Sequence, residues 1–315
     1  MGIKEILSEA KENVSLSECS SLEIGGPARY FFVAKNKEDL LKAAESAKKT
    51  NTPYLIIGEG TNILFPDEGF QGLVIKIKVD DPYVKEKKIY SGAGVRLISL
   101  LNLSLKNYLK GLEWAVGVPG TLGGAIYGNA QAFGQTMSDL VKSVEVFDTK
   151  NLEFRVLQKE ECLFKSKSSI FKKDKSLIII SAVLCLKKGS SSESRKEVKR
   201  YADYRKQKHP LYLPSAGSVF VNYEGRIEED SLLEKFPELR KFNEKEAIPS
   251  AYFIEKCGLK GKRIGGAKFS DQHANFIVNL GAAKAEDVIS LIELAKKRVK
   301  EEFDISLKEE IQIIK

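Results

Sequence analysis

The chain has 315 residues, of which 43% are hydrophobic and 30% charged, and its formal net charge is +8. This composition is typical of a globular protein with a sizeable core and enough length for two or three domains. It contains no run of about 18 apolar residues, which excludes a helix that crosses a membrane. The charged, amphipathic N-terminus lacks the apolar core of a signal peptide, so we expect a cytoplasmic protein without a membrane partner.

The positive charge does not by itself indicate nucleic acid. The lysines are spread along the whole chain without a dense basic block, so we expect no nucleic-acid partner. A solvated surface or a pocket that attracts anionic ligands explains the charge, and the sequence does not decide between these.

The scattered cysteines predict free and mostly buried thiols, and they are Cys19, Cys162, Cys185 and Cys257. With two histidines and no paired cysteines, the sequence predicts no metal site.

A β-α-β unit is predicted near the N-terminus. Residues 30–34 favour a strand, Asn36 is a good N-cap with Asp39 three residues on, and residues 54–57 return as a strand after a helix.

The glycine-rich turn 58–62 follows this unit. A Rossmann fingerprint needs a third glycine three residues after the second, where this chain has Ile63. A second candidate at 92–94 fails the same test, so these are glycine-rich turns of another kind.

The middle and C-terminal parts mix strands and helices. Short strands dominate 73–180 around one helix near 97–109, and the apolar run 177–186 predicts a buried strand. A helix is predicted over 194–204, and the alternating tail 305–313 predicts a final strand. Residues 285–303 predict an amphipathic helix. Its apolar face is expected to contain Val288, Ile289, Leu291, Ile292, Ala295, Val299 and Phe303.

Four segments are richer in glycine than ordinary loops. Glycine lets a backbone approach a ligand closely and direct its N–H groups at phosphate oxygens. Any one segment is more often a plain turn. Four together, with polar residues at their tips, favour a large nucleotide-like ligand. The segments are Ile24–Ala28, Gly58–Asn62, Gly117–Ala125 continuing to Asn129, and Pro214–Phe220.

These residues resemble the UDP-N-acetylenolpyruvoylglucosamine reductase family, also called UDP-N-acetylmuramate dehydrogenase. The resemblance covers nearly the whole chain in seven ordered motifs. They are Ser21–Ala28; Ile57–Leu64, with Thr61 for the usual serine; Gly111–Glu113 with Gly117–Ala125 and Asn129; Pro214–Phe220 with Asn222; Gly258–Gly261; His273–Asn279; and Leu307–Ile311.

The resemblance implies an α+β fold, in which a two-domain FAD-binding module of the vanillyl-alcohol-oxidase type is joined by a third, substrate-binding α+β domain. We expect residues 1–75 with 304–315 to form the first FAD-binding subdomain. Residues 76–205 are expected to form the second, and 206–303 the substrate-binding domain. The short chain between Phe171 and Ser218 resembles the form of the family that lacks an extra substrate-clamping insertion.

The resemblance also implies a reaction. NADPH reduces FAD, and hydride then passes to the enolpyruvyl ether of a small UDP-sugar substrate, with no obligate protein partner. The catalytic residues it implies are Ser218 as the acid, Glu310 and Lys167. Lys206, Asn222 and His273 fall where the family contacts the sugar-nucleotide. The expected FAD contacts are Gly58, Gly60, Thr61, Asn62, Ile63, Leu64, Gly117, Val118, Pro119, Gly120, Gly123, Gly124 and Asn129.

Plainer interpretations exist for three of these residues. Ser218 would also fit a turn serine that bonds to its own backbone. Glu310 cannot be distinguished from Glu309 by pattern, and only the motif chooses between them. His273 would also fit a satisfied core histidine.

One departure from the family concerns Lys167. The family has F-x-Y-R-x-S where this chain has Phe164-Lys-Ser-Lys-Ser-Ser169, so a lysine stands for the arginine and Ser166 for the tyrosine. Lysine keeps the charge but lacks the two-pronged geometry that suits a carboxylate. Further departures are Gln131, Val221 and Tyr223. A flavin-binding protein with impaired or redirected reductase activity is therefore the alternative, and an oxidase of the same flavin superfamily is a more remote one.

Overall fold

The computed structural model describes residues 2–245 and 247–315, and the chain divides into two compact units, which are treated separately. Unit 1 comprises Met1–Ser15, Pro27–Gly60 and Gly69–Gln207, and unit 2 comprises Leu16–Gly26, Thr61–Glu68 and Lys208–Lys315. Each unit has its own hydrophobic core. The division into two FAD-binding subdomains and a substrate-binding domain stays a prediction.

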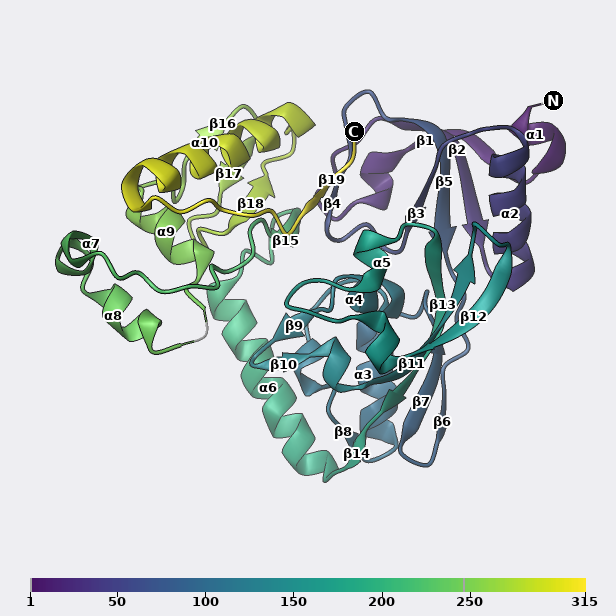
Figure 1. Ribbon diagram of the computed structural model, residues 1–315, viewed down its shortest axis with the longest axis horizontal. Coiled ribbons are helices and arrows are strands. Elements are labelled where there is room, and N and C mark those ends of the chain that lie inside the picture. Colours follow the sequence, from purple (N-terminus) through teal and green to yellow (C-terminus); the bar gives the residue numbers. More distant parts are fainter. Residues whose placement is uncertain (1, 246) are drawn as a thin grey trace. The chain divides into compact units, whose positions relative to one another are not determined.

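Unit 1 contains two sheets (Figure 1). The first has the order β1-β2-β5-β3, in which β5 pairs parallel with both β2 and β3. The second is antiparallel, with the order β12-β11-β13-β7-β6. The longer strands of the unit are β1 (Lys11–Ser15), β2 (Pro27–Ala34), β3 (Tyr54–Ile57), β5 (Phe70–Ile77), β6 (Tyr83–Lys85), β7 (Lys88–Gly92), β11 (Val141–Asp148), β12 (Glu153–Gln158) and β13 (Leu177–Cys185).

The other elements of unit 1 are shorter strands and helices. Two small antiparallel pairs join β9 (Gln131–Ala132) to β10 (Gln135–Thr136) and β8 (Leu109–Lys110) to β14 (Lys187–Lys188). The helices are α1 (Ile3–Ile6), α2 (Lys37–Lys49), α3 (Leu97–Lys106), α4 (Leu122–Tyr127), α5 (Ile170–Lys173) and α6 (Ser191–Lys208), with 3-10 turns η2 (Glu113–Ala115), η3 (Met137–Asp139) and η4 (Lys159–Cys162).

Unit 2 has a four-stranded antiparallel sheet with the order β15-β18-β17-β16. Its other strands, β4 and β19, pair in parallel, which joins two chain segments far apart in the sequence. The strands are β4 (Ile63–Leu64), β15 (Ser215–Ser218), β16 (Arg263–Ile264), β17 (Ala267–Phe269), β18 (Phe276–Asn279) and β19 (Gln312–Ile313). The helices are η1 (Leu16–Cys19), α7 (Asp230–Lys235), α8 (Glu238–Asn243), α9 (Ser250–Lys256) and α10 (Ala285–Phe303).

The predicted β-α-β unit is confirmed as β2-α2-β3. Asn36 caps α2, since its side-chain oxygen accepts a hydrogen bond of 2.7 Å from the Asp39 N–H. The predicted strand at 177–186 is confirmed as β13, and the amphipathic helix at 285–303 as α10. The predicted helices near 97–109 and 194–204 correspond to α3 and to the longer α6.

Three sequence predictions were wrong in detail. Ile289 is 37% exposed, because it lies about 100° around α10 from Val288 and so leaves the buried stripe. The tail forms a strand only at Gln312–Ile313 and a bridge at Glu309. The cysteines are free, but of the four only Cys162 is buried.

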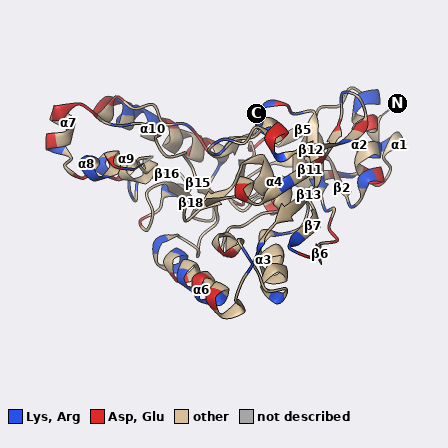
Figure 2. Ribbon diagram, turned by 60° about the horizontal axis from the view of Figure 1, so that its bottom comes forward, with Lys and Arg blue, Asp and Glu red and all other residues tan. Residues whose placement is uncertain are grey.

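The charged residues are distributed rather than concentrated. Figure 2 shows Lys and Arg interspersed with Asp and Glu along the helices of each unit, α6 and α8 among them. Within the described parts of the chain, no helix is long and apolar enough to cross a membrane.

Candidate active site

In unit 1 the two predicted flavin segments lie in contact. A Cβ added to Gly58 would lie 2.6 Å from Thr121 Oγ1, so only glycine fits there. Thr121 is the N-cap of α4, and its Oγ1 accepts a hydrogen bond of 3.3 Å from the Gly124 N–H. The turn after β3 therefore packs against the start of α4. The sequence analysis did not single out Thr121, although a threonine directly before a helix is a known capping signal.

The first turn of α4 is already hydrogen-bonded to its neighbours. The N–H groups of Leu122 and Gly123 donate to the carbonyls of Val95 and Ala93, over 2.8 and 2.9 Å. Gly123 also allows close packing, because a Cβ there would lie 2.9 Å from the Ala93 Cβ. This explains the second glycine-rich turn, 92–94, as a structural contact of α4.

The remaining glycines of this segment leave the backbone uncovered, as a cofactor with a planar ring and a diphosphate requires. Gly117 and Gly124 are exposed, and Gly117 and Gly120 have the positive φ angles of 69° and 107° that glycine adopts without strain. Val118 and Pro119 lie between them. FAD bound here would contact backbone atoms, because residues 117–124 include no charged side chain.

Asn129 connects the end of the flavin segment to the loop that carries Lys167. Its side-chain amide donates to the Lys165 carbonyl over 2.9 Å, and its oxygen accepts from the Ser138 N–H over 3.0 Å. The Ser169 hydroxyl adds a bond of 2.7 Å to the Tyr127 carbonyl. Lys167 itself has a left-handed backbone with φ of 50°. Asn129, a predicted cofactor contact, thus fixes the Lys167 loop beside α4.

In unit 2 the backbone brings Ser218 and Glu310 onto neighbouring segments. The Glu310 N–H donates to the carbonyl of Val219, the residue after Ser218, over 2.7 Å. The side-chain amide of Asn62 donates to the Glu310 carbonyl over 3.0 Å. Asn62, a predicted cofactor contact, therefore holds the backbone of a predicted catalytic residue, while Thr61 beside it is partly buried.

The structure distinguishes the two adjacent glutamates. Glu309 forms an ion pair with Lys296 of α10. Its backbone bridges to Phe220, so this part of the tail is extended. Successive side chains of an extended segment point to opposite faces, so the Glu310 side chain points away from Lys296. The two glutamates thus differ in their surroundings, and the choice of Glu310 as the catalytic one stays a prediction.

Asn275 fixes the backbone beside Ser218 and was missed by the sequence analysis. It is 3% exposed, and its side chain makes two bonds to the Phe220 backbone, accepting from the N–H over 3.0 Å and donating to the carbonyl over 2.8 Å. Its own carbonyl accepts from the Val219 N–H over 2.9 Å. The sequence feature that could have identified Asn275 was its position within the 273–279 motif.

We expect Asn275→Ala to lower the free energy of unfolding by about 2–4 kcal/mol, because a buried N–H and carbonyl of Phe220 lose their partner. Chemical denaturation of the full chain measures this loss. Asn222→Ala is the control, since Asn222 is exposed and accepts one hydrogen bond of 3.4 Å from the Ser250 N–H. Equal losses in the two variants would contradict the assigned role of Asn275.

His273 is a partly buried histidine. Burial lowers the pKa of its imidazole, and its Nδ1 accepts a hydrogen bond of 3.2 Å from the Asn275 N–H. Its ring lies edge-on to those of His209 and Phe276, at 5.5 and 4.8 Å between centroids. These contacts fit the interpretation of His273 as a core histidine. The residue is nevertheless partly exposed.

The remaining predicted residues divide by burial. Lys206 on α6 and Asn222 are exposed. Gly60 is buried, as are Ile63 and Leu64, which pair with β19. Any contact of Ile63 or Leu64 with a cofactor would therefore use backbone atoms.

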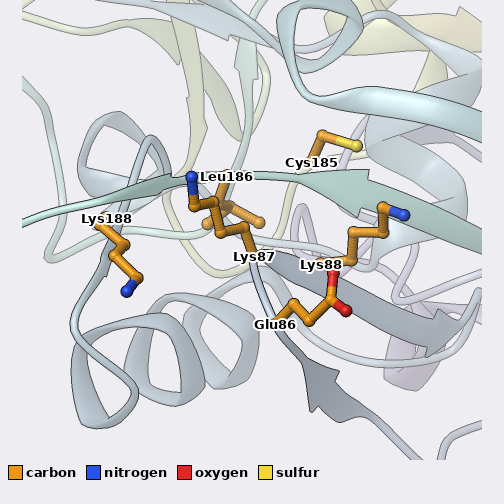
Figure 3. A pocket seen from close by; sticks show the side chains of 6 residues that line it. All are labelled: Glu86, Lys87, Lys88, Cys185, Leu186 and Lys188. Atoms are coloured by element: carbon orange, nitrogen blue, oxygen red, sulfur yellow. The ribbon is translucent and has the colours of Figure 1, made fainter.

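A cavity of about 620 Å³ elsewhere in unit 1 contains none of the predicted site residues. Figure 3 shows its lining side chains, which come from the β6–β7 turn and from the β13–β14 region. They are Glu86, Lys87, Lys88, Cys185, Leu186 and Lys188. Because surface lysines predominate and no buried polar group faces the cavity, it is not a candidate for the reaction.

Comparisons with known proteins agree with this geometry. Residues 28–153 match an FAD binding domain, and 209–314 match the C-terminal domain of UDP-N-acetylenolpyruvoylglucosamine reductase. The chain is 38% identical to the reductase of that name from Anoxybacillus flavithermus over 311 residues, covering 96% of this chain and 94% of the relative. It is 36% identical to the reductase from Caldanaerobacter subterraneus over 315 residues, covering 99% and 96%.

A solved structure is similar over the full length. The crystal structure of UDP-N-acetylenolpyruvylglucosamine reductase from Thermus caldophilus has a TM-score of 0.76 and 30% sequence identity, covering 97% of this chain and 100% of that one. The predicted α+β class, with an FAD-binding domain and a separate C-terminal domain, is confirmed. The chain therefore belongs to the UDP-N-acetylenolpyruvoylglucosamine reductase family, and it is an FAD-dependent oxidoreductase of peptidoglycan precursor synthesis.

Proposed function

We propose that this chain uses NADPH to reduce UDP-N-acetylglucosamine enolpyruvate to UDP-N-acetylmuramate in the cytoplasm, with Ser218, Glu310 and Lys167 as the catalytic residues. FAD held by this chain would supply hydride chemistry, with NADPH as the source and the terminal carbon of the enol ether as the acceptor. The neighbouring carbon then takes a proton, so that the double bond gains one hydride and one proton in total. The protein must stabilise negative charge at the substrate carboxylate and deliver that proton.

The observation that supports these roles most directly is the hydrogen bond from the Glu310 N–H to the Val219 carbonyl. It holds Glu310 and the residue after Ser218 on adjacent backbone segments, as two residues that serve one ligand would require. The Ser218 hydroxyl makes no hydrogen bond to another described residue, which argues against a turn serine that satisfies its own backbone. A hydroxyl without an internal acceptor is suited to donating to a substrate.

For FAD we propose the backbone of 58–64 and 117–124, with Asn129 in a supporting position. Lys206, Asn222 and His273 are proposed to contact the sugar-nucleotide. We further propose that the chain has the short form of the family without the substrate-clamping insertion. The two FAD-binding subdomains would comprise 1–75 with 304–315 and 76–205, and the substrate domain 206–303.

Purified protein should be yellow and should release its flavin into the supernatant on acid precipitation. The glycine segments provide backbone contacts rather than a nucleophile for covalent attachment. Adding NADPH should bleach the flavin absorbance, and adding the enolpyruvyl substrate should restore it. A protein that bleaches but is not reoxidised by this substrate would favour a redirected flavoprotein, while failure to take up FAD would contradict the assignment altogether.

A further inference from the structure

The hairpin of β6 and β7 in unit 1 carries a stacked pair of aromatic rings (Figure 1). Tyr83 and Tyr90 lie directly opposite each other in the antiparallel register, with 4.8 Å between the ring centroids and 2° between the planes. Tyr83 is 54% exposed, and β6 is the last strand of its sheet. No further strand of the described chain therefore covers the outer face of the Tyr83 ring, and a flat ligand ring has room to stack there.

Two lysines lie beside this aromatic pair. Lys85 and Lys88 are also directly opposite each other, two residues along their strands from Tyr83 and Tyr90, so all four side chains project from one face of the hairpin. Like charges at directly opposite positions destabilise a sheet. The other cross-strand neighbour of Lys88 is Cys185 of β13 rather than a carboxylate. Among the described residues neither ammonium group has an acidic partner.

The cavity of about 620 Å³ adjoins these lysines, because Lys88 and Cys185 are two of its lining residues. Figure 3 shows the side chains of Lys87, Lys88 and Lys188 around that of Leu186, which is 5% exposed and contributes apolar surface. The lining contains three lysines and one glutamate. Small-molecule sites have volumes of about 300–1,000 Å³. The cavity is therefore cationic and large enough for a phosphorylated small molecule.

A second pair of opposed lysines lies where the chain leaves β13. Lys187 of β14 is directly opposite Lys110 of β8. The Lys110 side chain packs over Gly189, since a Cβ added there would lie 2.9 Å from the Lys110 Cβ. Neither lysine has an acidic partner within the described ranges. Whereas the helices mix charges of both signs, the strand ends around the cavity concentrate positive charge, which attracts an anion.

We propose that this hairpin face (Tyr83, Lys85, Lys88 and Tyr90), together with the adjoining cavity, binds a nucleoside diphosphate. The base would stack on Tyr83, and the phosphates would accept hydrogen bonds from Lys85 and Lys88. Stacking on an aromatic ring tolerates any base, and charge-assisted hydrogen bonds to phosphate are strong. Two residues along a strand span about 7 Å, which is comparable to the separation of a nucleotide's base from its phosphates. The hairpin face contains none of the residues proposed for the reductase reaction, so its occupation does not depend on them.

The test uses FAD-saturated protein, in which the place of the cofactor's own diphosphate is filled. Isothermal titration calorimetry measures the binding of adenosine 5′-diphosphate, inorganic pyrophosphate and adenosine. We expect the diphosphate nucleotide to bind more tightly than either of its parts. Tyr83→Val should weaken nucleotide binding by about 5- to 100-fold, the range for the loss of one stacked base, and leave pyrophosphate binding unchanged. Lys88→Gln should weaken both by about 10- to 100-fold.

Conservative and distant variants serve as controls. Tyr83→Phe keeps the ring and should bind adenosine diphosphate as wild type does. Lys48→Gln should also change nothing, because Lys48 is an exposed residue of α2 outside the hairpin and the cavity. Circular dichroism establishes that each variant is folded, and Lys88→Gln decides the test if Tyr83→Val does not fold.

Four results would overturn the proposal. Nucleotide binding that no variant of the hairpin face changes would place the nucleotide elsewhere on the protein. Equal affinity for pyrophosphate and adenosine diphosphate, with Tyr83→Val neutral, would leave a phosphate site without base recognition. A single-stranded oligonucleotide that binds more tightly than the nucleotide, with the same dependence on Tyr83 and Lys88, would make the face a nucleic-acid surface. If none of the three probes binds, the lysines only protect the edge strand β6 from pairing with another chain.

Discussion

Ser218→Ala should slow reoxidation by the enolpyruvyl substrate by about 10²–10⁴-fold, the usual contribution of general acid catalysis. Reduction by NADPH should keep its rate, since no proton from Ser218 is needed in that half-reaction. Because the Ser218 hydroxyl has no acceptor among the described residues, its loss leaves no buried group unpaired and the fold should be intact. Stopped-flow absorbance of the flavin measures the two half-reactions separately.

The control for Ser218 lies in the same strand. The backbone carbonyl of Ser215 accepts a hydrogen bond of 2.8 Å from the Ser21 hydroxyl. Because alanine keeps this carbonyl, Ser215→Ala should leave both half-reactions unchanged. Were Ser218→Ala to slow both half-reactions equally, Ser218 would have a structural role in β15. An unchanged rate in both would mean that another group, or water, supplies the proton.

Local signals predicted the local structure well. The capping pair Asn36 and Asp39 indicated the start of α2, and the 3.6-residue periodicity indicated α10 with both of its ends. Ile289, the one residue wrongly assigned to that face, shows that an apolar pattern does not determine the burial of every residue in it. A hydrophobic residue next to a buried stripe is counted with it, although the helix turns it towards solvent.

The site could be predicted only as separate motifs. The hydrogen bond between Glu310 and Val219 joins residues about ninety positions apart, and no spacing rule indicates such a register. Asn275 was missed for a related reason. A polar residue is expected at the surface, and only the folded chain shows that Asn275 completes the Phe220 backbone and that α6 buries serine, tyrosine and arginine instead of an apolar stripe.

Lys167→Ala tests whether the departure from the family pattern has preserved the chemistry. If the ammonium stabilises the charge that develops on the substrate carboxylate, its removal should slow reoxidation by about 10²–10³-fold, as for the loss of a transition-state donor. Reduction by NADPH should change little. Alanine keeps a Cβ at the same left-handed backbone position, so the strain at φ of 50° is matched between the two proteins.

The loop around Lys167 supplies its own controls. Lys165→Ala should be neutral, because Lys165 is exposed and its backbone carbonyl, not its side chain, accepts from Asn129. Lys172 is a poor control, since its Nζ donates to the Lys167 carbonyl over 2.8 Å and supports the loop. Lys167→Arg should retain the rate, because a guanidinium binds a carboxylate through two parallel hydrogen bonds. If Lys167→Ala reduces the substrate as fast as wild type, the charge comes from another residue and Lys167 is a surface lysine that has replaced a dispensable arginine.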